Sequence, residues 1–477
     1  MKRASIARCI IGAALVVPCI LQAQSLMQAA PLSFGSGTVQ VSLLQNPGHS
    51  NIDIKELGGS LATLAQRQFD IMQAEWGARF PGDDHLSISE VADGGAVTSS
   101  QPGMIKIATS QLRGANASRL LVNTIANQWW GVRVRPATQN DAWITNGMCR
   151  YAEFEYLDTS VNKRSLQNAI ENSSASALAY DSAPLSDVGQ YSPDSSEFQA
   201  LTYDKGAMIF RMLRWQIGDA AFQKTLHEAL SHQTISSAQI EAMAEAASNQ
   251  NLKPFFTQWL DNTGAPTLQD NWTLYRLTDN KGYRTVGEIT EDLDLFRMPV
   301  DVQVETPGKT FHKRVDVVGP ETQFVINTPE IPKKISLDPD GRLLRNDSEM
   351  QVRVHILRGQ NFVAINDLKS AIQEYEKALA IDSINSLASY RLGEAYFQQR
   401  NYQAAANAFR DALHGDGVPK WTEVWSDVEL GKTFDLAGQR ERAINQYREA
   451  LQTQDNTGGA LDLARGYIAH PYTSPQR

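Results

Sequence analysis

LLVNTIANQWWGVRVRPATQNDAWITNGMCRY, residues 120–151, is the stretch that decides the fold of this chain of 477 residues. Apolar residues recur in it at helical spacing on both sides of a short segment that contains Pro136. The pattern predicts two helices, over residues 116–130 and 141–157, joined by a loop, because proline is not tolerated in a helix interior. Side chains that project from two neighbouring helices can meet in one site.

Polar residues within these helices have the spacing of a zinc peptidase site. Such a site carries H-E-x-x-H on one helix, where the two histidines share a face, and a third ligand on the next helix. The glutamate beside the first histidine polarises the zinc-bound water. At the four corresponding places this chain has Asn123, Thr124, Asn127 and Asn146.

Residues 120–151 resemble the aminopeptidase N family of gluzincin zinc metallopeptidases. The matching residues are Ala126, Gln128, Trp129, Gly131, Pro136, Asn140, Asp141, Trp143, Gly147 and Tyr151. The resemblance places the family's zinc ligands on Asn123, Asn127 and Asn146, and its general base on Thr124. It implies an aminopeptidase scaffold in which the catalytic residues have been replaced.

The resemblance continues on both sides of this stretch and covers about residues 36–345. Residues 203–207 (YDKGA) match the family's Y-x-K-G-A, in which the tyrosine stabilises the oxyanion, and Tyr203 retains that hydroxyl. Upstream, residues 95–99 (GAVTS) are the best counterpart of the substrate-binding G-x-M-E-N. Thr98 stands where the family's glutamate binds the free amine of the substrate.

The whole chain divides into segments of different periodicity. We expect a signal peptide over residues 1–24, an aminopeptidase-like gluzincin domain over 36–262, a β-sandwich over 263–346 and a helical array over 352–468. The fold class is α+β: a thermolysin-like catalytic-type domain with a helical subdomain, then a small sandwich, then an all-α array. Residues 160–196, rich in Ser, Asn, Asp and Ala, are expected to form a surface excursion that is partly helical.

Three segments of the last third resemble tetratricopeptide units: residues 359–380, 392–413 and 430–451. Gly393 and Gly431 stand where two helices pack too closely for a side chain, and Arg358 replaces the usual leucine. Each repeat buries its apolar face on a neighbour, so a short array needs further support. We therefore expect the array to dock on the sandwich, with residues 460–467 as its capping helix.

The start of the chain has the pattern of an export signal. Lys2, Arg3 and Arg8 flank an apolar run over residues 9–21, which is short for a membrane span. We expect a periplasmic or extracellular protein with no membrane span in the mature chain; the alternative is a short N-terminal membrane anchor. After cleavage Cys149 is the single cysteine, so we expect no internal disulfide.

The partners suggested by the sequence are peptides or proteins. A net charge of −9 argues against nucleic acid. Tyr390, Glu394 and Phe397 occupy first-helix positions that face the concave groove in tetratricopeptide arrays, which predicts binding of an unknown protein or peptide. The alternative is that these three side chains only pack the array.

The replaced residues change the chemistry of the cleft. Carboxamides are neutral and offer hard carbonyl oxygens to a borderline-soft cation, and a threonine cannot act as a general base near neutral pH. We expect no bound zinc, no other cofactor and no catalytic residue, and we interpret Thr124 and Tyr203 as relics. His227 and His232, in HEALSH, are five residues apart and diverge on a regular helix.

Three functional hypotheses remain open. The first is an inactive peptidase-like protein that binds peptides or proteins through a relic cleft, lined by Asn123, Asn127, Asn146 and Tyr203, and through the groove of the array. The second is an active zinc-dependent aminopeptidase that uses substitute ligands, its own or a partner's; the retained Tyr203 hydroxyl favours it. The third is a scaffold in which the repeats do all the binding.

Overall fold

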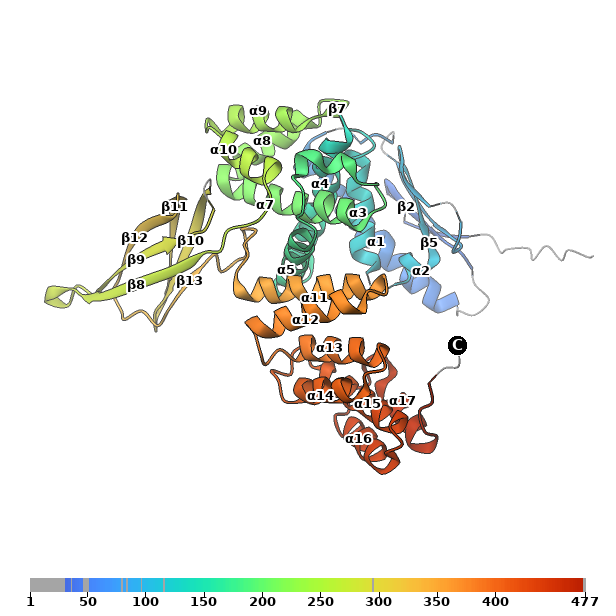
Figure 1. The fold of residues 1–477 in the computed structure, drawn as a ribbon. Helices are drawn as coiled ribbons and strands as arrows, with labels where there is room; N and C mark the ends of the chain where they lie inside the picture. Colours follow the sequence, from blue (N-terminus) through green and yellow to red (C-terminus); the bar gives the residue numbers. More distant parts are fainter. Residues whose placement is uncertain are drawn as a thin grey trace, which may run out of the picture.

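The computed structural model describes residues 31–474 except 36, 46–50, 79, 83–84, 96, 115 and 294–295. The signal peptide predicted over residues 1–24 lies outside the described residues. Figure 1 places a mixed sheet and a helical region together, a strand-rich region on one side of the helices, and a stack of helices beneath them.

A five-stranded mixed sheet opens the fold. Its order is β1 (Leu32–Phe34), β2 (Val39–Leu43), β3 (Leu86–Val91), β5 (Met104–Ala108) and β4 (Thr98–Gln101). The three central strands are parallel, and both edge strands are antiparallel to their neighbours. Alternating burial along β2 and β3 gives the sheet one apolar face, which helix α1 (Asn51–Trp76) helps to cover. The strand-rich start predicted from the sequence is confirmed.

The two helices predicted from residues 120–151 are present as α3 (Ala117–Trp129) and α4 (Ala142–Ser160), and they pack against each other. The segment expected to be a partly helical surface excursion does contain a helix, α5 (Lys163–Ala179). One face of α5 is buried, because its alanines and serines allow neighbouring helices to approach closely. Small residues are compatible with both surface and core, which is why composition alone misplaced this segment.

Short helices complete this first domain. They are α2 (Thr109–Leu112), η1 (Gln139–Asp141), η2 (Leu185–Gln190), α6 (Ser196–Gln199), η3 (Ala200–Lys205), α7 (Gly206–Ile217), α8 (Asp219–Ala229), α9 (Ser237–Ser248), α10 (Lys253–Phe256) and η4 (Thr257–Asp261). A two-residue parallel pair, β6 (Arg135–Pro136) with β7 (Thr234–Ile235), ties the loop after α3 to the α8–α9 connection. The segment η3 is a π-helical turn that runs directly into α7.

Two three-stranded sheets follow, in agreement with the predicted sandwich. One has the order β11 (Thr310–Val318), β10 (Arg297–Glu305), β13 (Lys334–Leu337), and the other β12 (Glu321–Thr328), β9 (Tyr283–Thr290), β8 (Gln269–Arg276). Val300, Val302 and Val304 of β10 are buried in the same apolar cluster as Phe324 of β12. The two inner faces therefore share one core.

The chain ends in helical pairs, as the repeats predict. The helices are α11 (Ser348–Ala364), α12 (Leu368–Ile381), α13 (Ser386–Gln398), α14 (Tyr402–Leu413), α15 (Trp421–Leu436), α16 (Arg440–Gln452) and α17 (Ala460–Ala469). A Cβ placed on Gly393 would lie 2.6 Å from the ring of Phe409, and the corresponding distances are 2.3 Å for Gly359 to Tyr375 and 2.4 Å for Gly431 to Tyr447. The buried aromatic ring of each second helix thus requires a glycine on the first.

The array docks on α5 and not on the sandwich, so this prediction from the sequence is wrong. Helix α11 packs against α5, which lies directly above it in Figure 1. Arg358 donates hydrogen bonds of 3.1 Å to the carbonyls of Leu178 and Ala179, and Arg353 pairs with Glu171 at 2.9 Å. The departure of Arg358 from the repeat pattern is explained by this contact with the end of α5.

Within the described residues, no helix combines the length and the apolarity needed to cross a membrane.

Candidate functional site

The three polar side chains of α3 singled out by the sequence are half-buried and held by local contacts. Asn123 donates through Nδ2 to Glu153 Oε1 of α4 at 2.8 Å. The Thr124 hydroxyl donates to the carbonyl of Leu121 at 3.0 Å, within its own helix. These contacts use the amide and hydroxyl groups as hydrogen-bond donors.

Asn127, one turn further along α3, lies against the start of the following loop. Its Nδ2 donates to the carbonyl oxygen of Trp130 at 3.2 Å and approaches Cys149 Sγ of α4 at 4.0 Å. Its Oδ1 is buried and has no hydrogen-bond partner among the described residues. The Cys149 thiol donates to the same carbonyl oxygen of Trp130, at 3.5 Å. Burial raises the pKa of this thiol to about 12. The thiol therefore keeps its proton at neutral pH.

Asn146 of α4 is joined to the π-helical turn η3, which carries Tyr203. Its Nδ2 donates to the Thr202 hydroxyl at 3.0 Å. This proximity depends on the next residue, Gly147, because a Cβ there would lie 2.6 Å from the carbonyl carbon of Gly206. Backbone contact between α4 and the η3–α7 junction thus brings Asn146 and Tyr203 to the same region.

A network of charges crosses this region. Glu153 is 2% exposed and binds Arg119 of α3 at 2.9 Å and Arg150 of α4 at 2.8 Å. Arg150 also lies 3.2 Å from Asp204 of η3. Burial works against the charge of Arg150, but Glu153 and Asp204 outweigh it, so its pKa is raised. Burial raises the pKa of Asp204, and Arg150 offsets this only in part.

Tyr203 is the one group here with a retained catalytic counterpart in the sequence resemblance. Burial, followed by the nearby Cys149 and Glu153, raises the pKa of its hydroxyl to about 12, although Arg150 acts in the opposite direction. The hydroxyl is therefore protonated at neutral pH and can donate a hydrogen bond.

Tyr203 lines a cleft of about 610 Å³ that is shared by two parts of the molecule. Arg119, Arg150 and Asp204 line it from the first domain, together with hydroxyl and amide side chains of α5. Helix α11 contributes Arg353, Ile356, Leu357 and Gln360, and α13 contributes Leu387. The array therefore forms one wall of the cleft.

Comparison with known proteins bears on this arrangement. Residues 103–259 match the peptidase family M1 domain, and residues 356–419 match a tetratricopeptide repeat. The chain carries a peptidase M1-like domain followed by tetratricopeptide repeats. The M1-like match begins before α3 and ends within η4, so it includes both helices of the site.

Individual relatives align with the M1-like region. The rice (Oryza sativa subsp. japonica) protein "Aminopeptidase M1-D" is 27% identical over 161 residues, which are 32% of this chain and 18% of that protein. "Tricorn protease-interacting factor F2" of Thermoplasma volcanium is 25% identical over 240 residues, 46% of this chain and 30% of that protein. The chain thus spans less than a third of the length of these relatives.

A solved structure shares the overall fold. The crystal structure of Legionella pneumophila aminopeptidase A in complex with aspartic acid superposes with a TM-score of 0.53 at 13% identity, covering 92% of this chain and 59% of that one. At this identity the likeness concerns the fold alone.

Several residues of the M1-like sequence pattern have structural roles. Gln128 accepts from the Gly103 backbone at 2.9 Å and donates to the Ser99 carbonyl at 2.8 Å, which fixes α3 to the β4–β5 hairpin. Trp143 Nε1 donates to the Ser237 hydroxyl at 2.9 Å, which fixes α4 to α9. The Tyr151 hydroxyl accepts from Arg214 at 2.8 Å. These three residues of the sequence pattern hold the helices of the domain together, so the pattern can be retained for structural reasons alone.

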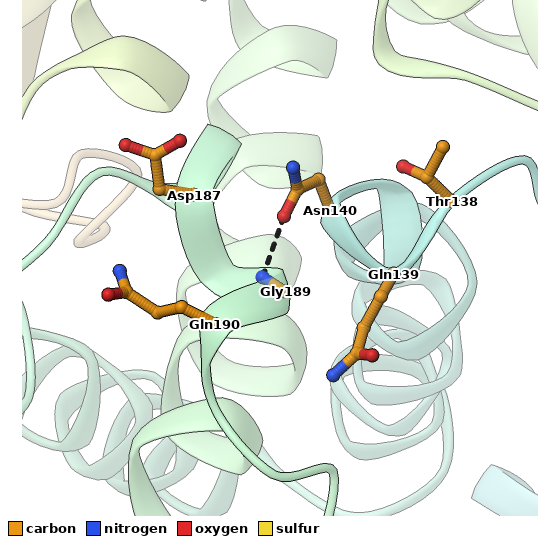
Figure 2. Close-up of a pocket in the computed structure, with 6 residues that line it drawn as sticks. All are labelled: Thr138, Gln139, Asn140, Asp187, Gly189 and Gln190. Carbon is orange, nitrogen blue, oxygen red and sulfur yellow. Dashed lines mark hydrogen bonds between the residues drawn. The ribbon is translucent and has the colours of Figure 1, made fainter.

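Asn140, another residue of the pattern, lies at a second hollow. This open, polar depression of about 540 Å³ is lined by residues of η1 and η2 and shares no lining residue with the cleft. Figure 2 shows the side-chain oxygen Oδ1 of Asn140 accepting from the Gly189 backbone N–H, a bond of 2.6 Å. Asn140 thus joins the two short helices, while the Asp187 and Gln190 side chains point away from it.

The residues that the sequence resemblance places at the family's metal positions do not have the chemistry of zinc ligands. Asn123, Asn127 and Asn146 present one neutral carbonyl oxygen each, and their amide groups are directed at protein acceptors. Catalytic zinc prefers imidazole, thiolate or carboxylate ligands. The carboxylate of Glu153 is already bound by two guanidinium groups. In the part of the chain that is described, no group of three or more His, Cys, Asp or Glu side chains is placed to hold a metal ion.

The histidine pair considered as a substitute does not converge on the cleft. His227 Nε2 bonds to the carbonyl of Glu75 at 2.9 Å, and His232 lies beyond the end of α8. Neither lines the cleft.

The three predicted groove residues of α13 differ in their surroundings. Tyr390 is 4% exposed and packs on Trp421 and Phe409. Its hydroxyl donates to Glu394 at 3.0 Å, and Glu394, whose side chain is 31% exposed, also pairs with Arg391 at 2.6 Å. Tyr390 therefore serves the interior of the array, while Glu394 stays partly accessible. Phe397 is partly buried and faces the segment after α17.

Sequence reasoning missed the charged residues of the cleft. Asn146, Arg150 and Glu153 recur at i, i+4 and i+7 on α4, a helical spacing that could have revealed them. Arg353 and its neighbours on α11 could not have been found in this way, because they reach the cleft only through docking of the array.

Proposed function

We propose that this chain is a catalytically inactive aminopeptidase-like protein that binds peptides or proteins. The observation that supports it best is the set of three carboxamides at the zinc positions, each bonded through its amide group to the protein: Asn123 to Glu153, Asn127 to Trp130 and Asn146 to Thr202. Hydrolysis at this place needs a Lewis acid or a general base, and carboxamides with a threonine provide neither.

Binding is supported by the cleft that remains. Its 610 Å³ lie within the range of ligand pockets, and guanidinium, hydroxyl and amide groups line it beside the apolar Ile356 and Leu357. Such a lining suits the main chain and side chains of a peptide. The repeats supply a second surface of the kind used in protein–protein interaction.

Metal analysis and an activity assay test the proposal together. The purified protein is expected to contain zinc well below one equivalent and to leave aminoacyl-anilides unhydrolysed, before and after zinc addition. Stoichiometric zinc accompanied by turnover would overturn the proposal.

The alternative is an active aminopeptidase with substitute ligands, and the retained Tyr203 favours it. The Tyr203→Phe variant separates the two. An enzyme that uses this hydroxyl on the oxyanion should lose about 100-fold or more in kcat, the usual effect of removing an oxyanion donor. In an inactive protein the substitution leaves the anilide assay at background.

We also propose that the protein is exported, on the basis of the basic and apolar pattern of residues 2–21. N-terminal sequencing of the mature protein should find its first residue close to residue 25; an uncleaved chain would contradict the signal peptide.

A further inference from the structure

The segment after α17 folds back onto the tetratricopeptide array. Helix α17 ends at Ala469, and His470 is extended, with φ −132° and ψ 125°. Pro471 accounts for this, because the residue before a proline is driven out of the helical conformation. The chain then turns toward α13 and α15, where Tyr472 is half-buried while Pro471 and Thr473 stay exposed.

The backbone of this segment is bound by a buried carboxylate. The Tyr472 N–H donates to Asp435 Oδ2 of α15 at 2.8 Å. The Asp435 side chain is 1% exposed and is fixed by Arg440 at 3.0 Å and by the Tyr447 hydroxyl at 3.0 Å. A backbone N–H is present in every residue except proline, so this anchor would accept an extended chain of many sequences.

The side chain of Tyr472 occupies an aromatic site that we call the tyrosine slot, formed by Phe397, Lys432 and Tyr467. The ring centroid of Tyr472 lies 6.3 Å from Phe397 and 5.4 Å from Tyr467, the latter edge to face. Lys432 Nζ lies 4.9 Å from the ring centroid of Tyr472, in a cation–π contact. The slot is built from three different helices and selects an aromatic ring.

We propose that the tyrosine slot and Asp435 form a binding site for an extended peptide with an aromatic side chain, and that residues 471–474 occupy it as an internal competitor. A main-chain anchor beside a side-chain pocket is how proteins read extended peptides. The internal segment has a high effective concentration, on the order of millimolar, so a partner must displace it. This inference rests on the peptide-binding role proposed for the array and names the class of partner.

The contacts that hold the internal segment are the Tyr472 N–H bond to Asp435 and the packing of the Tyr472 ring, and a peptide with an aromatic residue can replace both. An open hollow of about 380 Å³ runs beside it, lined by residues of α17 and by residues 470–473. Of the first-helix residues predicted to face the groove, Tyr390 is buried and not available to such a peptide, whereas Phe397 lines the slot. Recognition is therefore concentrated on one aromatic position and its backbone N–H.

Binding of a synthetic peptide in trans tests the inference. The probe is a fluorescently labelled peptide of residues 468–475, and its match is the same peptide with alanine in place of the tyrosine. The full-length Tyr472→Ala variant is expected to bind the tyrosine peptide at least about tenfold more tightly than the original chain, because the slot is vacant. Thr473→Ala, an exposed neighbour, should behave like the original chain.

A double variant and the alanine peptide define the site further. Tyr472→Ala combined with Lys432→Gln should lose the peptide, and the alanine peptide should bind neither variant. Equal binding to the original chain and to Tyr472→Ala, or no binding to a folded Tyr472→Ala variant, would overturn the inference. Because the probe is the chain's own sequence, such a failure is separate from the metal and turnover assays, which decide the catalytic part of the proposed function.

Discussion

At Glu153 a carboxylate whose side chain is 3% exposed is shared by two guanidinium groups and one carboxamide. Arg119 and Asn123 approach it from α3, while Arg150 comes from its own helix. A buried charge persists only when its partners satisfy it, so these contacts hold α3 and α4 in fixed register. The order of the cleft wall thus depends on a residue that neither the zinc pattern nor the repeat pattern contains.

The Glu153→Gln substitution should therefore destabilise the protein. It leaves Arg119 and Arg150 without their shared counter-charge, and the loss should be about 2 kcal/mol in the free energy of unfolding. This is less than the ~3–5 kcal/mol of a fully buried pair, because the side chains of the two arginines are 32% and 27% exposed. Urea denaturation measures it. The control is Glu155→Gln on the same helix: the Glu155 side chain is 30% exposed, against 3% for Glu153, so loss of its pair with Arg214 should cost less than ~1 kcal/mol. Equal losses would contradict the prediction.

Asp427 of α15 predicts a dependence of stability on pH. Burial, with smaller effects of Glu423 and Glu449, raises its pKa to about 7 in the folded chain. In the unfolded chain the group releases its proton near pH 4. Between these values the folded state binds more protons, so stability declines as pH rises from about 4 to 7.

The Asp427→Asn variant should lose this decline, because a carboxamide does not titrate in this pH range. Its side-chain oxygen can still accept the hydrogen bond from Gln446. Its unfolding free energy relative to the original chain should increase from pH 5 to pH 8, measured by urea titration at each pH. Asp338, whose pKa burial raises to about 6, is present in both proteins and cancels in the difference. A difference that does not change with pH would show that Asp427 ionises normally.

At the scale of elements, arginine side chains join helix ends across the molecule. Arg314 of the sandwich donates to the last carbonyls of α7, Arg358 of the array to those of α5, and Arg440 to those of α17. The final carbonyls of a helix lack partners in the helix and carry partial negative charge, which a guanidinium satisfies with two donors. The same device thus connects the first domain to the sandwich and to the array.

The Arg358→Leu variant tests this device, because leucine is the usual residue of the repeat at this position. Loss of two charge-assisted hydrogen bonds to Leu178 and Ala179 should weaken docking of α11 on α5 by about 1–3 kcal/mol. Hydrogen exchange of the last turn of α5 should accelerate, while α15 and α16 are unchanged. If leucine stabilises the protein, packing within the repeat outweighs the contact with α5.

The elements themselves were largely predictable, and the reason is local periodicity. The helices around Asn123 and Asn146 and the glycines of the repeats follow from spacing within short windows. The burial of Tyr390 was not predictable, because Trp421, which covers it, begins α15 in the stretch between the second and third predicted units. The α11 wall of the cleft was not predictable either, because it depends on docking between distant segments: Arg358 and Ala179 are 179 residues apart.

At the scale of the whole molecule, the cleft joins the two functional parts. Ile356 and Gln360 of the array face Tyr203 and Arg150 of the M1-like domain across the same space. A ligand in the cleft would contact both parts, so its binding depends on the docking of α11. Val354 of α11 is buried in the main apolar cluster, which is otherwise formed by the first domain and the sandwich. The first repeat is therefore part of the M1-like domain as much as of the array.

A fragment of residues 346–477 should accordingly fold only in part. Without α5, helix α11 exposes Val354 and loses the Arg353–Glu171 and Arg358 contacts, whereas α15, α16 and α17 keep their own apolar cluster. Amide exchange in α11 should be at least about tenfold faster in the fragment than in the full chain, a difference of ~1.4 kcal/mol, and exchange in α15 should be similar in both. The full-length Arg358→Leu variant serves as an intermediate case. Equal protection of α11 in the fragment and the full chain would mean that the array is stable without the M1-like domain, and the shared cleft would then be a contact between two independent parts.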